Sequence, residues 1–222
     1  MFDTPRRRLG RVLIVLLGLV ASGPVLAHPH GWIDLRMRLV VDDEGRLTGL
    51  HQSWRMDPFY SLVVLEEMGQ AVGDGSLDAA LDQLGSEIRD NLASYGYYTE
   101  LTLAGETLGF DAVNDYTVLE RGGRVEFIFL LPLSEPQPLA GETLRYQVFD
   151  PTYYIEMVHE EEGNRPASDA LLVGGDLACE THVEPADPDP ERVMQAAMLD
   201  VTDVAARGRG RHFAETGEVT CR

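Results

Sequence analysis

Two histidines, His28 and His30, stand two residues apart near the start of the chain, with Pro29 between them. Neutral imidazole is a good ligand for zinc, copper and nickel. Side chains two residues apart in an extended chain point to the same side. If the chain is cut before His28, the new α-amino group is a further donor. Pro29 lacks a backbone N–H, which blocks square-planar binding through successive amides. The pattern therefore favours a site built from side chains, with or without the amine.

Two carboxylates could complete this site, and each has a structural alternative. Asp57 precedes Pro58, a pair that suits the N-cap and first position of a helix, so it is either a ligand or only a cap. Asp150 precedes Pro151 in an irregular corner, where it is either a ligand or a turn-forming hydrogen-bond hub. Asp57 is the first candidate and Asp150 the second. We expect a divalent transition metal (zinc, nickel, cobalt or copper) at His28, His30, Asp57 and Asp150; a frayed N-terminus is the alternative for the histidines.

The remaining chemistry-bearing residues do not form a catalytic pattern. His51, His159, His182 and His212 are scattered, and each is expected to be an ordinary surface or core histidine. The sequence has no Gly-x-Ser-x-Gly, no His-Glu-x-x-His, no phosphate-binding glycine loop and no Cys-x-x-Cys. These absences predict a protein that is not an enzyme.

A predicted hairpin positions the candidate ligands. Residues 31–41 and 47–56 alternate between apolar and polar side chains, as half-buried strands do, and a turn of four residues separates them. If Val41 pairs with Arg46, His30 faces Asp57 across the hairpin. The same register sets Asp34 opposite Ser53 and Arg36 opposite His51. A slip of two residues would keep the faces but change the partners.

The rest of the chain predicts an α+β fold of mostly antiparallel β-sheet, with hairpins in a sandwich-like arrangement. Two helices follow the first hairpin, the first ending at Gly69 and the second beginning at Ser76. A further helix is expected near the C-terminus, over residues 191–204. Strands are expected over residues 99–103, 117–120, 124–133, 144–149, 153–158 and 170–173, with another in the tail.

The N-terminus reads as a secretory signal peptide over residues 1–27. It has a basic start, an apolar run of about ten residues and the small-residue site Val25-Leu26-Ala27. The run is too short for a membrane span, which needs about 20 residues. Residues 28–222 are then expected to form a single periplasmic domain with no membrane span.

Charge and cysteine content agree with an exported protein. The chain has no lysine, and residues 28–222 carry 14 arginines and 36 acidic side chains, a net charge of about −22. Such a surface repels nucleic acid and anionic lipid. Cys179 and Cys221 are the two cysteines, and an oxidising compartment predicts a disulfide between them. A metal site made of both cysteines is the alternative.

Four motifs carry a resemblance to a known family. They are His28-Pro29-His30-Gly31-Trp32-Ile33-Asp34, then Trp54-x-x-Asp57-x-Phe59-Tyr60, then Asp150-Pro151-Thr152-Tyr153-Tyr154, and Phe213-Ala214-Glu215 before Cys221. Together they resemble the bacterial family called domain of unknown function 1007. The resemblance implies a periplasmic component of an uncharacterised ABC-type transport system, encoded in many cases near nickel/cobalt-type or zinc-related membrane transporters.

The residues and the resemblance together predict a periplasmic accessory protein for transition-metal transport, which binds or hands over a divalent ion. A membrane transporter or permease component is the expected partner. Two alternatives stay open at this point. One is a docking module for a permease that binds no metal itself, and the other is a histidine-brace copper enzyme, supported only by an N-terminal histidine.

Overall fold

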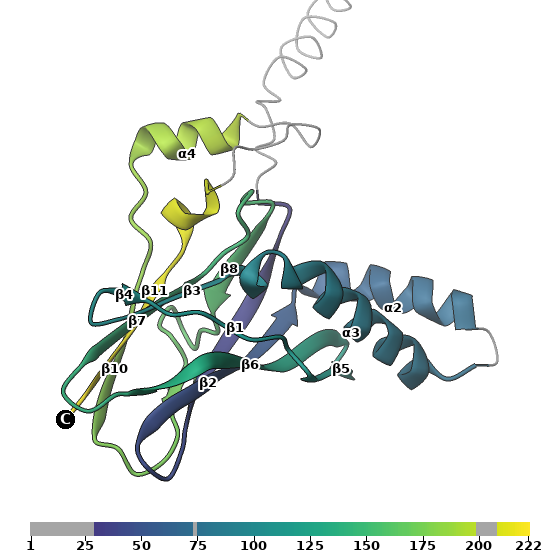
Figure 1. Cartoon of the computed structure of the whole chain (residues 1–222). Coiled ribbons are helices and arrows are strands. Elements are labelled where there is room, and N and C mark those ends of the chain that lie inside the picture. The colour runs from purple at the N-terminus through teal and green to yellow at the C-terminus, as the bar shows by residue number, and fades with distance from the viewer. Residues whose placement is uncertain (1–28, 73–74, 199–207) are drawn as a thin grey trace, which may run out of the picture.

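The computed structural model describes residues 29–72, 75–198 and 208–222, which form a sandwich of two mostly antiparallel sheets with helices at its margins (Figure 1). The predicted α+β, sandwich-like fold is confirmed. The predicted signal peptide, the candidate ligand His28 and most of the C-terminal half of the helix predicted over residues 191–204 lie outside the described residues.

The first sheet is built around the N-terminal hairpin. Its strand order is β5-β6-β2-β1-β8, and β9 also pairs with β1. All neighbours are antiparallel except β8 and β9, which run parallel to β1. The bounds are β1 (Gly31–Val41), β2 (Arg46–Met56), β5 (Asp115–Arg121), β6 (Arg124–Pro138), β8 (Ile155–His159) and β9 (Leu171–Val173).

The second sheet has the order β10-β11-β7-β3-β4 and is antiparallel throughout. Its strands are β3 (Thr99–Leu103), β4 (Glu106–Thr107), β7 (Thr143–Val148), β10 (Cys179–Glu184) and β11 (Thr216–Cys221). The strand expected in the tail is thus β11, and it lies inside this sheet. The short strand β4 and the C-terminal partner strand β10 were not predicted.

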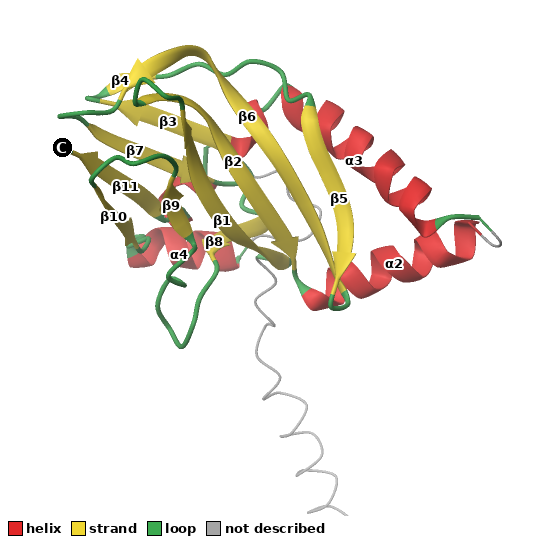
Figure 2. Ribbon diagram, turned by 90° about the horizontal axis from the view of Figure 1, so that it is seen from below, coloured by secondary structure: helices red, strands yellow, loops and turns green. Residues whose placement is uncertain are grey.

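Helices cover the part of the first sheet that the second sheet does not reach (Figure 2). They are α2 (Pro58–Val72) and α3 (Leu77–Ala93), which pack on each other and on β6 and β5. A further helix, α4 (Pro190–Ala197), lies away from these two, and its Ala196 packs with Tyr153 and Phe213. Two 3-10 turns, η1 (Gly96–Tyr98) and η2 (Gly210–Phe213), complete the described elements. Within the described residues, no helix combines the length and the apolar character needed to cross a membrane.

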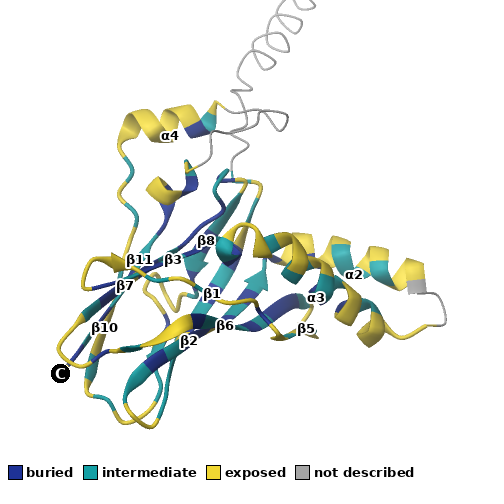
Figure 3. Cartoon of the chain, viewed as in Figure 1, coloured by how far each residue is buried: buried dark blue, intermediate teal, exposed yellow. Residues whose placement is uncertain are grey.

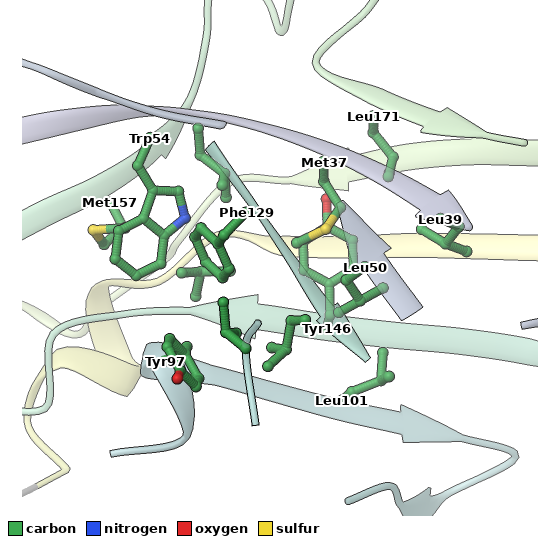
Figure 4. Packing of buried hydrophobic residues seen from close by; sticks show 14 of the residues in the cluster. Met37, Leu39, Leu50, Trp54, Tyr97, Leu101, Phe129, Tyr146, Met157 and Leu171 are labelled. Atoms are coloured by element: carbon green, nitrogen blue, oxygen red, sulfur yellow. The ribbon is translucent and has the colours of Figure 1, made fainter. Parts of the chain in front are cut away.

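The hydrophobic core lies between the two sheets and under the helices (Figure 4). The odd-numbered residues of β1 point inward, as the predicted alternation requires, and Leu35, Met37 and Leu39 are fully buried. Trp54 of β2 packs edge-on against the rings of Phe127 and Phe129. Burial of apolar side chains from both sheets is the main force that holds the sandwich closed.

The predicted register of the first hairpin is wrong by two residues over most of its length. Asp34 lies opposite Arg55 instead of Ser53, and Arg36 lies opposite Ser53 instead of His51. Two local features cause the shift. The hairpin closes with a bond from the Asp42 N–H to the Arg46 carbonyl, which shortens the loop by one residue, and a bulge near Val41 adds another. The faces of both strands are as predicted, because a two-residue slip preserves them.

Several element boundaries also differ from the prediction, and two of these differences have a local cause. The helix expected to end at Gly69 continues to Val72. An exposed glycine inside a helix costs only about 1 kcal/mol, and packing of neighbouring Met68 against the core offsets this. The strand expected from Tyr153 begins instead at Ile155, because the backbone of Tyr153 is left-handed, with φ of 59°.

The predicted disulfide is present. Cys179 of β10 and Cys221 of β11 are directly opposite each other, with Cα atoms 4.0 Å apart, and their sulfur atoms are bonded. The bond ties the C-terminal strand to β10, so Cys179 and Cys221 are not a metal site in this structure.

Candidate metal-binding groove

A groove with a volume of about 270 Å³ lies where β1 begins and β2 ends. Its walls come from the first residues of β1, the first two turns of α2 and the residues that lead into β8. His30 and Asp57 both line it, although 27 positions separate them in the sequence. Most of the remaining wall is apolar and aromatic, including Trp32, Phe59 and Tyr154.

The end of β2 is fixed by Arg124, and this fixes Asp57. The Arg124 guanidinium donates to the backbone carbonyls of Arg55 and Met56 and forms an ion pair with Asp34. Asp57 follows at once and its N–H donates to the Trp32 carbonyl, at 3.0 Å. A backbone hydrogen bond therefore joins Asp57 to the start of β1.

Asp57 caps α2 with one carboxylate oxygen. Its Oδ1 accepts hydrogen bonds from the N–H groups of Phe59 and Tyr60, both at 2.9 Å. This is the N-cap role expected from the Asp-Pro pair. Among the described residues no hydrogen-bond donor is bonded to Oδ2. That oxygen lies beside Gly31, where an added Cβ would be only 2.7 Å from it.

Gly31 therefore lets the carboxylate of Asp57 sit directly against the first residue of β1. A side chain at this position would occupy the space that Oδ2 takes. His30 is the preceding residue, so the close approach brings a carboxylate oxygen next to the segment that carries the imidazole. The predicted pairing of His30 with Asp57 in the strand register is not found, but both residues line the groove.

His30 is held by Tyr154. Its N–H donates to the Tyr154 carbonyl at 2.9 Å, and the two rings lie 4.5 Å apart between centroids with a tilt of 38°. Through this pair the start of β1 is joined to the loop that precedes β8. His30 is exposed at the groove's edge.

Asp150 shapes that loop with both carboxylate oxygens. Oδ1 accepts from the N–H and the hydroxyl of Thr152, and Oδ2 accepts from the N–H groups of Tyr154 and Ile155. The side chain is 5% exposed. Four donors at distances of 2.8 to 3.2 Å make Asp150 the hydrogen-bond hub that was the alternative to a ligand. Its place as a second metal ligand stays a prediction.

The structure thus brings two of the four predicted ligands, His30 and Asp57, to one groove, and places Asp150 behind it in support of Tyr154. In the ranges 29–72, 75–198 and 208–222, no group of three or more His, Cys, Asp or Glu side chains is arranged to hold a metal ion. His28, the remaining predicted ligand, lies outside these ranges.

The sequence interpretation missed a buried polar chain that joins the two sheets. His159 of β8 is 2% exposed; its Nδ1 lies 2.8 Å from Glu215 Oε2 and its Nε2 lies 2.6 Å from the Tyr146 hydroxyl. Burial, and then the Glu215 charge, raise the pKa of Tyr146 well above its ordinary value. The sequence held one sign of this polar chain, because Glu215 belongs to the Phe213-Ala214-Glu215 motif. Tyr146 is fully buried, so this chain is a structural link between the sheets.

Glu156 of β8 and Glu160, which directly follows the strand, have opposite electrostatic surroundings. Burial, and then the Glu215 carboxylate, raise the pKa of Glu156 above its ordinary value. Burial also acts to raise the pKa of Glu160, but ion pairs with Arg36 and Arg55 outweigh it, and the net shift is downward. Glu160 is thus held as a carboxylate beside two guanidinium groups.

Comparison with known proteins decides the family. The family model described as "Protein of unknown function (DUF1007)" matches residues 13–221. The chain belongs to this family. A relative in Haemophilus influenzae, described as "Uncharacterized protein", is 31% identical over 155 residues, which cover 65% of this chain and 69% of the relative.

Among solved structures, AChBP from Bulinus truncatus matches 86% of this chain and 85% of its own, with 10% identity and a TM-score of 0.31. A TM-score this low supports no argument. The DUF1007 match spans all four motifs named above, and with them every predicted ligand. The groove described here is therefore built from residues inside the DUF1007 region.

Proposed function

We propose that this DUF1007 protein is a periplasmic accessory protein of a transition-metal transport system, and that it binds a divalent ion at the groove and hands it to a membrane permease. The proposed ligands are His28, His30 and Asp57, with Asp150 as support for the loop that carries Tyr154. The ion is cargo in this proposal, so it has to arrive and leave.

One observation carries the proposal. Asp57 uses only Oδ1 to cap α2, while Oδ2 points to the residue after His30. A cap residue needs only one acceptor, so the second oxygen has coordination capacity to spare. Imidazole nitrogen with carboxylate oxygen is a donor set that suits zinc, copper and nickel.

The position of the groove suits transfer. It lies at the rim of the first sheet and not inside the core, and His30 is exposed. Two imidazoles and one carboxylate leave at least one position of a four-coordinate ion for water or for a ligand of the receiving protein. A closed structural site would offer no such position.

The test is metal titration of purified protein that begins at His28, by calorimetry with zinc, nickel, cobalt and copper salts. We expect binding to weaken in His28→Ala, His30→Ala and Asp57→Asn by more than the roughly tenfold that loss of an outer-shell partner costs. Asp57→Asn is the sharp variant, because Asn caps a helix as well as Asp does but carries no charge. His182→Ala, on an exposed position of β10, is the matched control and should bind as the wild type does.

Affinity should also fall on acidification, because imidazole must be neutral to bind a metal. The proposal fails if the three ligand variants bind each ion as tightly as the wild type. It also fails if the wild type binds none of the four ions in the presence of a competing chelator, or if His182→Ala weakens binding as much as the three ligand variants do.

A further inference from the structure

The groove is bordered by a set of large apolar side chains that the described structure leaves exposed. We call Trp32, Phe59, Tyr60, Leu62, Val63 and Tyr154 the apolar rim; Phe59 is 76% exposed and Leu62 is 60% exposed. These residues come from β1, from the first two turns of α2 and from the loop before β8. Large apolar side chains that gather at one place on a surface mark an interaction site, whereas scattered ones do not.

The rim is not the packing face of α2. The opposite side of the helix supplies Val64, Leu65 and Met68 to the core, and Ser61 is buried and accepts a hydrogen bond from the Val125 N–H. Phe59, Leu62 and Val63 are three and four residues apart, so they form one stripe on the outer side. Figure 3 shows this outer side of α2 as largely exposed. The helix therefore has two apolar sides, of which the fold uses one.

Charge limits what can cover this stripe. Glu66 and Glu67 continue it at its far end, both are exposed, and α2 contains no basic residue. A second copy packed in parallel on the same stripe would bring the acidic ends of the two copies together, which is unfavourable. An antiparallel copy would set each acidic end against an apolar end, and in neither arrangement would Glu66 and Glu67 meet a basic residue of α2. An anionic lipid surface is repelled by the net charge of −19 for the same reason. The surface fits an apolar segment with lysine or arginine at its margin.

The shape of the surface fits a helix. The ten residues of α2 from Pro58 to Glu67 span roughly 15 Å, at 1.5 Å per residue. The groove runs beside them and is open to the surface. An amphipathic helix laid in an apolar groove, with anchors three and four residues apart, is a common mode of recognition between proteins.

We propose that the apolar rim is the docking surface for an amphipathic helix of a partner protein, with basic residues beside its apolar face. The inference rests on the proposed function for its purpose, because a helix on the rim would lie over His30 and Asp57 and so bring the receiving protein to the ion. The docking itself requires no metal, so the two proposals can fail separately.

The probes are two synthetic 18-residue helical peptides with the same leucine face, one with lysine and one with glutamate on the polar face. Binding is followed by calorimetry and by the emission of Trp32, since the second tryptophan, Trp54, is buried. We expect the lysine peptide to bind and the glutamate peptide to bind at least tenfold more weakly. Phe59→Ser/Val63→Ser should reduce binding of the lysine peptide at least tenfold. Val193→Ser, at an exposed apolar position of α4, is the matched control and should bind normally.

Glu66→Gln/Glu67→Gln should reduce the difference in affinity between the lysine peptide and the glutamate peptide, because it removes the acidic charges and keeps the apolar contact. The inference is overturned if the Phe59→Ser/Val63→Ser variant binds the lysine peptide normally, or if both peptides bind the wild type equally. It is also overturned if the wild type forms a dimer that this variant abolishes, or binds neutral phosphatidylcholine vesicles through the rim. Peptide binding without metal binding would contradict the proposed function and support the docking surface. Metal binding without peptide binding would support the proposed function and contradict the docking surface.

Discussion

Two Asp-Pro corners flank the groove, and they differ in how they use their carboxylates. Asp57 and Asp150 are both buried, each is followed by proline, and each accepts backbone hydrogen bonds from residues just after it. Asp57 accepts through Oδ1, whereas Asp150 accepts through both oxygens. The first corner therefore keeps an oxygen for chemistry, and the second is committed to structure.

This difference ranks the two carboxylates as ligands. A carboxylate with four accepted hydrogen bonds must give up some of them to bind an ion, and buried N–H groups are costly to leave unpaired. A helix cap with a second oxygen beside the groove has no such cost. Identical dipeptides can thus serve different purposes, depending on how many N–H groups the following loop turns back toward the carboxylate.

The largest expected effect lies away from both corners and separates stability from binding. The C-terminal end lies at the opposite end of the molecule from α2 (Figure 1). Cys179→Ser/Cys221→Ser opens a loop with a sequence separation of 42 and should lower the free energy of unfolding by roughly 4 kcal/mol. Urea denaturation measures this. Metal affinity of the folded variant should stay unchanged; a parallel loss of affinity would mean that the groove depends on global stability.

Asp150→Asn tests the structural corner. The amide cannot accept hydrogen bonds at its nitrogen, so at least one of the buried N–H groups around it loses its partner. The free energy of unfolding should fall by about 1–3 kcal/mol, as measured by urea denaturation. If this variant is as stable as the wild type and only metal binding is lost, Asp150 is a ligand and the distinction between the corners is wrong.

Asp57→Asn tests the other corner, where the expected effect on stability is small. Asn is as good an N-cap as Asp, so the free energy of unfolding should change by less than about 0.5 kcal/mol. Asp57→Ala, which removes the cap, should cost about 1 kcal/mol. Thermal or urea unfolding of both variants checks this. A large loss in Asp57→Asn would show that the carboxylate charge supports the fold.

The smallest effects concern Glu156 of β8 and Glu160 just after it, whose pKa values are shifted in opposite directions. The raised pKa of Glu156 means that its contribution to stability is present at low pH and is lost as the pH rises through that pKa. The lowered pKa of Glu160 means the reverse, a contribution present at neutral pH and lost on acidification. As the pH rises from about 4 to about 8, the free energy of unfolding of Glu156→Gln should increase relative to that of the wild type, and that of Glu160→Gln should decrease. If the free energy of unfolding had the same pH dependence in both variants, the opposite pKa shifts of Glu156 and Glu160 would be contradicted.

Much of the fold could be predicted from alternation alone. β1 and β3 have the bounds that their apolar patterns predicted, and the helix that begins at Leu77 follows its N-cap Ser76. The hairpin register could not be predicted, because it depends on a bulge and on loop closure that leave no strong pattern in the sequence. In the second sheet, the tail strand β11 and the disulfide were predicted. β10 was not, because none of its residues is buried and its sequence therefore has little apolar alternation.

The candidate site was predictable in its residue types and less so in its geometry. The histidine pair and Asp57 were found from spacing, and the parity of the strands placed them on one side. The role of Gly31 could not be read from the sequence, because a close approach by Asp57 appears only once β1 and β2 are paired. His159 was taken as an ordinary histidine, since its partners Tyr146 of β7 and Glu215, just before β11, approach it only in the folded sandwich.

The pairing of β1 has a consequence for how the chain folds. β1 is the first strand to be synthesised, yet it completes its hydrogen bonding only with β8 and β9, more than 120 residues later. In the second sheet, β11 at the C-terminal end is likewise flanked on both sides. Contacts between residues so far apart in sequence make loop closure slow, and such topologies fold slowly. The groove at the start of β1 therefore forms only once the chain is available as far as β8, so a chain interrupted before β8 would carry the candidate ligands His30 and Asp57 without the complete groove.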